Sequence, residues 1–271
     1  MTGTPHEDPI LIDLPSSLKA TRRGPVGHIR LTRVAKRNAL DLDTVLGLET
    51  FFTKLPDDIR AVVLTGEGEH FSAGLDLSEV AEAHDPLEGV LHSRAWHRAF
   101  EAIQFGRTPV VTALHGAVVG GGLELTASTH IRVADRSTYY GLPEGSRGIF
   151  LGGGGSVRIA RLVGVPCVQD LMLTGRTLNA EEGHAAGITQ YLVETGEAEE
   201  KAFALAARAA TNTATTNFAV LHALPRIFES DPTSGLLTES LMASIAETSP
   251  EARQRLKDFL EMRAAKVLRQ S

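Results

Sequence analysis

Three short runs of apolar residues constrain the fold more than any other feature of this sequence. They cover residues 61–64, 110–114 and 131–134 and consist mostly of Val, Ile, Leu and Ala. Strands of a parallel sheet that helices cover on both faces read as short continuous apolar runs of this kind. A helix is expected over residues 87–105, and a shorter one lies between the second and third runs. Strands that alternate with helices predict an α/β fold with right-handed crossovers.

The pattern of the chain changes at about residue 195. Further strands are expected before this point, over residues 10–14, 26–33 and 188–193. Asp41 is expected to be the N-cap of an amphipathic helix. Helices without an intervening strand are expected after it, over residues 197–210, 217–228, 234–247 and 250–267. We therefore expect an α/β core at residues 1–195 and a helical region at residues 196–271.

The composition excludes several classes of protein. The 271 residues are 42% hydrophobic and 22% charged, which is ordinary for a globular protein long enough to bury its core without metals or crosslinks. The chain has 27 Lys and Arg residues against 33 Asp and Glu residues, a net charge of −6. This balance argues against binding to nucleic acid or to an anionic membrane surface.

The cysteine content and the N-terminal sequence point to a compartment. The single cysteine, Cys167, cannot form an intramolecular disulfide, which favours a reducing environment. Residues 1–9 form a loose leader with acidic residues where a signal peptide needs basic and apolar regions. The longest apolar stretch, residues 108–128, contains His115 and Glu124 and does not resemble a membrane span. We expect a cytoplasmic protein.

The motifs that would indicate a nucleotide, nucleophile or metal site are incomplete or absent. Residues 66–71 begin like a dinucleotide fingerprint, but they lack its third glycine and carry two glutamates where a pyrophosphate needs positive potential. The glycines at 152–155 lack the Lys and Ser or Thr of a phosphate loop, and no nucleophile elbow is present. His92 and His97 lie five positions apart, which does not place them on one helical face. We therefore expect no metal site.

The first candidate site is the segment His-Phe-Ser-Ala-Gly-Leu-Asp-Leu at residues 70–77. Its small residues let the backbone bend sharply, so that successive N–H groups can point at a ligand. Asp76 is expected to be the N-cap of the helix that follows. Taken by itself, the segment is also consistent with an ordinary turn between a strand and a helix.

The second candidate site lies at residues 115–124 and contains three consecutive glycines at 120–122. These glycines open a helix, where free N–H groups and the positive end of the helix dipole favour a developing anion. Glu124 falls in the first turn of this helix, and its neighbours Leu123 and Leu125 should turn it inward. A glutamate that only complements the helix dipole is the alternative, although a buried carboxylate without a role is costly.

The third candidate site is the segment Tyr-Gly-Leu-Pro-Glu at residues 140–144. It ends on Glu144, which precedes a glycine-rich turn and a helix expected over residues 154–162. A solvated glutamate in a loop is an equally good interpretation of this segment when it is taken alone. The three segments become informative when they are read together.

Together these segments resemble the crotonase superfamily, the enoyl-CoA hydratases and isomerases. The matching motifs are Phe-Ser-Ala-Gly-Leu-Asp-Leu at 71–77, Gly-Gly-Gly-Leu-Glu-Leu at 120–125, Pro-Glu at 143–144, Gly-Ile at 148–149 and the glycines at 152–155. An Arg-Asn-Ala-Leu segment at 37–40 and the tail at 256–263 also fit. The resemblance covers about residues 20–268, and the order and spacing of the motifs make it specific.

The resemblance implies a fold, an assembly and a chemistry. It implies a spiral core of ββα units and a C-terminal helical region that builds trimers or dimers of trimers, the latter being homohexamers. It also implies an acyl-CoA thioester substrate and a role in fatty acid metabolism, with no separate cofactor because coenzyme A is part of the substrate. By this resemblance Leu75 and Gly121 would supply the N–H groups of an oxyanion hole, and Glu124 and Glu144 would be the two catalytic glutamates.

The resemblance also implies which residues contact coenzyme A. Lys36 and Arg37 would hold its phosphates at the mouth of the pocket, and a solvated basic turn is the alternative for these two residues. The turn at residues 73–77 would lie along the adenine and pantetheine. The full implied set is Lys36, Arg37, Ala39, Ala73, Gly74, Asp76 and Leu77.

The presence of both glutamates favours an enoyl-CoA hydratase, which adds water to a 2-enoyl-CoA to give a 3-hydroxyacyl-CoA. Two carboxyl groups that share one proton can take a proton from water and deliver one to Cα. Arg147 and Leu151 stand where family hydratases commonly have an apolar residue and a proline, so an isomerase, hydrolase or lyase reaction stays open. A non-catalytic RNA-binding or scaffolding relative also stays open, although the negative charge and both glutamates argue against it.

Overall fold

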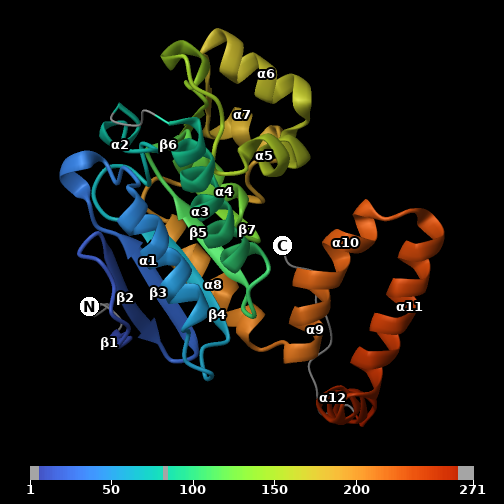
Figure 1. The fold of residues 1–271 in the computed structure, drawn as a ribbon. Coiled ribbons are helices and arrows are strands. Elements are labelled where there is room, and N and C mark those ends of the chain that lie inside the picture. Colours follow the sequence, from blue (N-terminus) through green and yellow to red (C-terminus); the bar gives the residue numbers. More distant parts are fainter. Residues whose placement is uncertain (1–5, 82–84, 262–271) are drawn as a thin grey trace. The chain divides into compact units, whose positions relative to one another are not determined.

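The computed structural model describes residues 6–81 and 85–261 and confirms the predicted α/β class (Figure 1). The main sheet contains β1 (Asp8–Pro9), β2 (Leu18–Arg23), β3 (Val26–Leu31), β4 (Ala61–Gly66), β5 (Val110–Leu114), β7 (Ile131–Asp135) and β10 (Tyr191–Val193). The strands lie side by side in that order. From β3 to β10 they are parallel, whereas β1, β2 and β3 pair antiparallel. The three apolar runs thus form neighbouring parallel strands, as predicted.

A second, smaller sheet lies beside the candidate site segments. It contains β6 (Ala117–Val119), β8 (Tyr139–Gly141) and β9 (Thr177–Asn179), in the order β6-β8-β9. Strand β6 lies within the second candidate segment and leads to its three glycines, and β8 overlaps the start of the third and leads to Glu144. Because β6 and β8 pair in parallel, the chain leaves both strands at the same edge of this sheet. This pairing brings the two glutamate-bearing segments together.

Helices cover both faces of the main sheet. The helices of this part of the chain are α1 (Leu42–Thr53), α2 (Ser78–Ala81), α3 (Pro86–Gln104), α4 (Gly121–Ala127), α5 (Gly155–Val163), α6 (Val165–Thr174), α7 (Ala180–Ala185) and α8 (Ala198–Ala210). Alternate residues of a strand point to opposite faces. Leu64 of β4 therefore joins the core cluster that contains α1 and α3, whereas Val63 packs with α8 on the other face (Figure 1).

The N-terminal part of the sheet differs from the sequence prediction. The strand expected over residues 10–14 is wrong, because the N–H of Ile12 bonds to the carbonyl of Ile10 in a local turn. The apolar side chains of this segment serve packing instead, since Ile10 belongs to the core cluster and Ile12 and Leu14 pack against it. Strand β2, the small sheet, α6 and α7 were not predicted.

The predicted cap of α1 is confirmed. Asp41 caps this helix, where its carboxylate accepts a 2.9 Å hydrogen bond from the Thr44 N–H.

The boundary between the two compact units also differs from the expected one. The units divide between Ala210 and Thr211 rather than at residue 195, because α8 packs on β4, β5 and β7 as part of the α/β unit. The second unit contains α9 (Ala214–Phe218), a π-helical turn (Ala219–Ala223), α10 (Leu224–Glu229), α11 (Pro232–Thr248) and α12 (Pro250–Leu260). The helix expected over residues 217–228 is therefore interrupted, and Pro225, which has no N–H to donate, lies just after the π turn.

Some expectations fall on residues that the structure does not describe. The last expected helix runs to residue 267, but α12 ends at Leu260 and residues 262–267 lie outside the described residues. Most of the predicted leader, residues 1–5, also lies outside them. Within the described ranges, no helix is long and apolar enough to cross a membrane.

The second unit exposes a row of apolar side chains, which leads to a prediction about assembly. Leu237, Leu241 and Ile245 recur every four residues along α11, and all three side chains are more than half exposed. A row of this kind needs a covering surface, and we expect a second copy of the chain to supply it. Light scattering coupled to size exclusion should give a trimer or a dimer of trimers.

A matched pair of variants makes this prediction specific. Leu237→Glu combined with Ile245→Glu should shift the assembly toward smaller species. Glu239→Lys, on the opposite side of α11, should leave it unchanged. A stable monomer of the wild-type chain at micromolar concentration would contradict the prediction.

Candidate active site

The three candidate segments meet around one cavity of the α/β unit. The cavity has a volume of about 170 Å³ and lies where residues 73–77, α3, the start of α4 and residues 144–153 come together. Of the predicted site residues, those that line it are Ala73, Leu75, Leu77, Gly121, Glu124 and Glu144. The sequence therefore identified the part of the chain that builds this cavity.

Two backbone N–H groups at the cavity have no protein acceptor among the described residues. Leu40 bonds to both neighbours of Leu75, because its N–H donates to the Gly74 carbonyl at 2.7 Å and its carbonyl accepts from the Asp76 N–H at 2.8 Å. The N–H of Leu75 between them is left without a partner. The N–H of Gly121 is also left without one, because it lies in the first turn of α4.

These two N–H groups lie close together, and glycine is required for their approach. A Cβ at Gly121 would lie 3.2 Å from the Leu75 nitrogen, and one at Gly74 would lie 3.0 Å from the Gly121 nitrogen. Gly74 also has φ +91°, a conformation that other residues rarely adopt. The backbone therefore presents two donors to one small region of the cavity.

Glu124 is buried and held by a glycine turn. Its side chain is only 4% exposed, and its Oε1 accepts hydrogen bonds of 2.8 Å from the N–H groups of both Gly153 and Gly155. Burial raises the pKa of Glu124, the nearby charge of Glu144 adds to this shift, and the two N–H donors and Arg158 oppose it, which leaves the pKa at about 7. Glu124 can therefore gain or lose a proton near neutral pH.

Arg158 holds the turn that holds Glu124. This residue of α5 is 9% exposed, and its Nη1 donates to the Gly153 carbonyl at 3.0 Å. Its Nε donates to Oε1 of Gln104, the last residue of α3, at 2.7 Å. The guanidinium thus ties α3 to the turn, and its charge favours the ionised form of Glu124. Arg158 is a positioning residue that the sequence analysis missed.

Glu144 is the second buried carboxyl group that lines the cavity. Its side chain is 6% exposed, and its Oε2 has no hydrogen-bond partner among the described residues. Burial raises its pKa above the ordinary value, while the positive charge of Arg147 opposes that shift. A buried carboxyl oxygen without a partner is costly unless it is protonated or meets a ligand. Glu144 is therefore suited to hold a proton next to a bound molecule.

Of the residues implied for coenzyme A, Ala73 and Leu77 line the cavity, and the others lie beside it. The chain at residues 37–40 runs next to residues 73–76, because the Ala73 N–H donates to the Arg37 carbonyl at 2.9 Å. Lys36, Arg37, Ala39, Gly74 and Asp76 do not line the cavity itself. Lys36 and Arg37 are exposed at the end of a 3₁₀ turn (Val34–Lys36). This turn lies next to residues 73–77, where coenzyme A is expected to bind.

Asp76 has a structural role that the sequence analysis only partly predicted. Its carboxylate lies 2.9 Å from Arg33 in an ion pair and also accepts a hydrogen bond from the N–H of Ser78, the first residue of α2. The hydrogen bonds to Ser78 and Arg33 lower the pKa of Asp76 to about 2. The capping role is confirmed, and the ion pair fixes the turn that carries Leu75.

One face of α3 contributes residues that the sequence analysis did not assign to the site. Gly89, His92, Ser93 and Trp96 line the cavity, and their spacing of i, i+3, i+4 and i+7 places them on one side of the helix. The sequence motifs test His92 only as a metal ligand, and its place in the cavity wall is a finding of the structure. The helical spacing was the available signal, but the sequence alone did not show which face of α3 turns toward the glycine turns.

A cluster outside the cavity has the composition of a metal site. The ligand atoms of Glu7, His28 and Glu199 lie within 4.8 Å of one another. Arg23 and Arg30 form ion pairs with both carboxylates, so the charge of this group is already balanced. Burial, helped by the charge of Arg30, lowers the pKa of His28 to about 3, which leaves its ring neutral. We interpret the cluster as an ion-pair network that joins β2 and β3 to α8.

Comparison with known sequences gives a family for the chain. A sequence model of the family described as enoyl-CoA hydratase/isomerase matches residues 21–268. A probable enoyl-CoA hydratase of Mycobacterium bovis is 31% identical over 241 residues, which cover 88% of this chain and 93% of the relative. A short-chain-enoyl-CoA hydratase of Clostridium acetobutylicum is 29% identical over 245 residues, which cover 89% and 94% of the two chains.

Solved structures show the same fold. A Rhodopseudomonas palustris protein assigned provisionally as an enoyl-CoA hydratase superposes with a TM-score of 0.90 at 54% identity, over 95% of this chain and 100% of the other. DspI of Pseudomonas aeruginosa superposes with a TM-score of 0.88 at 28% identity, over 95% and 99% of the two chains. These matches confirm the predicted crotonase fold. The chain belongs to the enoyl-CoA hydratase/isomerase family, the crotonases.

Proposed function

We propose that this protein is an enoyl-CoA hydratase, which adds water to a 2-enoyl-CoA thioester to give a 3-hydroxyacyl-CoA. The observation that carries the proposal is the pair of buried carboxyl groups, Glu124 and Glu144, in one cavity with two unpartnered N–H groups. Family relatives from Mycobacterium bovis and Clostridium acetobutylicum carry hydratase names, which supports the same reaction.

The two N–H groups would act as an oxyanion hole. When water adds to Cβ of the thioester, negative charge develops on the carbonyl oxygen in an enolate-like transition state. The N–H groups of Leu75 and Gly121 would donate to this oxygen. Donors that the backbone already holds in place need no reorganisation, and each contributes about 3 kcal/mol in comparable sites.

The two glutamates would divide the proton transfers. The Oε1 of Glu124 is occupied by the N–H groups of Gly153 and Gly155, which leaves its Oε2 to accept a proton from water. The hydroxyl group then bonds to Cβ. Glu144, protonated and with Oε2 directed at no protein group, would deliver its proton to Cα. The total number of protons on the pair is unchanged, since Glu124 has gained the one that Glu144 has lost, and transfer of a proton from Glu124 to Glu144, directly or through water, restores the starting state before the next turnover.

The shared proton sets the reaction apart from alternatives in the same family. An isomerase moves one proton between two carbons and can work with one carboxyl group, whereas hydration needs both an acceptor and a donor. A pKa of about 7 for Glu124 means that the pair can hold a single proton between them at neutral pH. This arrangement favours hydration over isomerisation, hydrolysis or another lyase reaction. It also favours an enzyme over a non-catalytic relative.

Coenzyme A would lie along the turn at residues 73–77, with its phosphates near Lys36 and Arg37. This placement follows from the position of both basic residues beside that turn. The proposed reaction uses no metal or redox cofactor. The expectation of a cytoplasmic location stays a prediction.

Amide variants of the two glutamates test the proposed reaction. Glu124→Gln and Glu144→Gln should each lower kcat by about 10²-fold or more with little change in KM, because an amide keeps the shape but cannot transfer the proton. The measurement is the loss of absorbance of the conjugated thioester of crotonyl-CoA. Glu88→Gln, on the exposed first turn of α3, is the matched control and should keep wild-type turnover. Near wild-type turnover in both site variants would overturn the assignment of these two residues.

The raised pKa of Glu124 predicts a pH-dependent effect on stability. An unfolded glutamate has a pKa of about 4.3, so between this value and about 7 the folded protein keeps a proton that the unfolded chain has lost. Protein stability therefore falls as pH rises through this window, and Glu124→Gln removes the loss. The free energy of unfolding of the variant relative to wild type should increase by about 1–3 kcal/mol between about pH 5 and pH 8. Denaturant titrations that give the same difference at both pH values would show that Glu124 is not a raised-pKa group.

Two Gly→Ala changes in the cavity test whether the N–H groups of Leu75 and Gly121 must lie close together. A Cβ at Gly121 would lie 2.8 Å from Cζ3 of Trp96, so Gly121→Ala must displace the indole and narrow the space beside the Leu75 N–H. Turnover should fall at least about tenfold. A Cβ at Gly89 on α3 meets nothing within 4 Å, and Gly89→Ala should keep turnover and stabilise the helix by about 0.5–1 kcal/mol. Equal turnover in the two variants would remove Gly121 from the proposed oxyanion hole.

A further inference from the structure

Arg147 adds an unpaired cation to the wall of the cavity. It lies on a 3₁₀ turn (Gly145–Arg147) that follows Glu144, and its N–H donates to the Glu144 carbonyl at 3.0 Å. Side chains three residues apart eclipse one another on a 3₁₀ turn. Glu144 and Arg147 therefore face the same side, and both line the cavity. The guanidinium is thus a near neighbour of the proposed reaction centre.

No carboxylate of the described chain neutralises this guanidinium. Ion pairs within 4.0 Å join many other arginines of residues 6–81 and 85–261 to acidic residues, but none of those in the described ranges involves Arg147. Arg147 forms no ion pair within 4.0 Å with Glu144, the acid nearest in sequence, whose Oε2 has no hydrogen-bond partner among the described residues, although the charge of Arg147 opposes the rise in the pKa of Glu144. The charge of Arg147 is therefore available to a ligand.

The surroundings of Arg147 determine which ligand group would use this charge. Ile149 and Phe150 line the same wall, Trp96 lines the wall formed by α3, and the acids at the cavity, Glu124 and Glu144, are assigned to the reaction. Arg147 is exposed, so a purely apolar acyl chain would leave the hydrogen bonds of its guanidinium to water. A carboxylate would replace them, because its two oxygens match the planar fork of arginine.

We propose that Arg147 selects acyl-CoA substrates whose acyl chain ends in a carboxylate. This inference rests on the proposed function, because it takes the cavity to hold the acyl group of a 2-enoyl-CoA. The phosphates of coenzyme A are a less suitable partner, since Lys36 and Arg37 lie on a separate 3₁₀ turn beside residues 73–77. The substrate class is therefore the CoA thioesters of unsaturated dicarboxylic acids.

Matched pairs of thioesters test the selection by Arg147. Each pair has the same chain length and differs in whether the acyl chain ends in a carboxylate or a methyl group, as in glutaconyl-CoA and pentenoyl-CoA, and several chain lengths are compared. The wild-type enzyme should have a higher kcat/KM for the carboxylated member of at least one pair. Arg147→Met should reduce that value by about 10- to 100-fold, mainly through KM, and should leave the value for the methyl member unchanged or higher. Arg147→Lys should keep part of the preference, because it keeps the charge without the fork.

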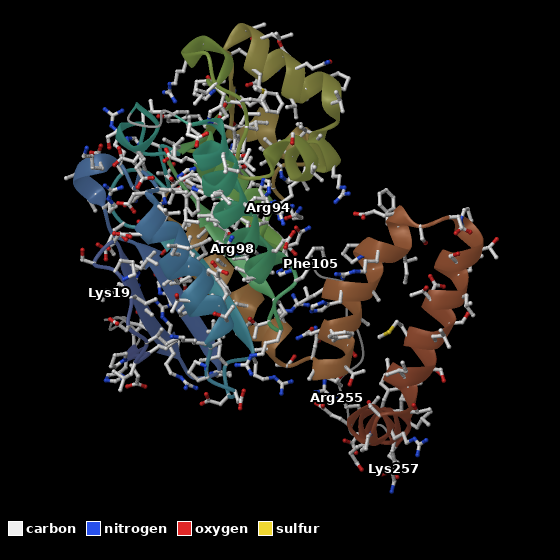
Figure 2. The ribbon with its side chains drawn as sticks, in the orientation of Figure 1. Lys19, Arg94, Arg98, Phe105, Arg255 and Lys257 are labelled. Carbon is white, nitrogen blue, oxygen red and sulfur yellow. The ribbon has the colours of Figure 1, made fainter. Side chains whose placement is uncertain are left out.

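The control is an arginine outside the cavity. Arg94, labelled on α3 in Figure 2, is exposed and does not line the cavity. Arg94→Met should leave kcat/KM unchanged for both thioesters of a pair. If Arg147→Met lowers kcat/KM equally for both thioesters of a pair, Arg147 acts through Glu144 or coenzyme A, and the proposed selection is wrong. A wild-type enzyme that hydrates only the methyl members would also overturn it, while leaving the hydratase proposal intact.

A binding measurement separates the inference from the proposed reaction. Glutaryl-CoA and pentanoyl-CoA are saturated and cannot be hydrated, and they differ only in the terminal group. Calorimetry should show tighter binding of glutaryl-CoA to the wild-type protein and loss of this difference in Arg147→Met. Equal binding of the two thioesters by wild type would overturn the selection. Loss of the difference in the variant would support it even if no thioester in the series gained water.

Discussion

The two hydrogen bonds that Gly153 and Gly155 donate to Glu124 hold a buried carboxyl group in place, and the proposed chemistry depends on them. Burial by itself would keep this group protonated, whereas the donors and Arg158 favour its ionised form. The opposing effects leave its pKa at about 7. The glycine turn, the start of α4 and Arg158 therefore work as one unit, which sets both the position and the protonation of the proposed base.

Much of this site could be predicted because its central residues lie in short contiguous motifs. Gly121 and Glu124 share one helix start, and Leu75 follows Gly74, whose positive φ is a conformation that glycine adopts readily. The buried parallel strands were predictable for a similar reason, since an apolar run in the sequence corresponds directly to burial on both faces of the sheet. Local sequence determines these features. The resemblance to the crotonases added that the three separate segments belong to one site.

Features that depend on contacts between distant segments could not be predicted. Arg158 reaches Gln104 across more than fifty residues, and nothing in either neighbourhood indicates the pairing. Residues 10–14 are apolar like a strand, yet after Ile10, whose N–H bonds to the Ala20 carbonyl of β2, the segment turns and packs on the core. Helix α8 looks like the first element of the helical region but covers the sheet, because its apolar face fits Val63 and its neighbours. In each case tertiary packing, rather than the local pattern, determines the outcome.

The most direct test of the account is the fate of solvent atoms during turnover. The protein is incubated with 2-enoyl-CoA thioesters, neutral and carboxylated, in water labelled with heavy oxygen or deuterium, and the products are analysed by mass spectrometry. The account predicts a 3-hydroxyacyl-CoA with one labelled oxygen at Cβ and, in deuterated water, one deuterium at Cα. A shifted double bond without labelled oxygen, or release of free coenzyme A, would contradict hydration by the Glu124 and Glu144 pair.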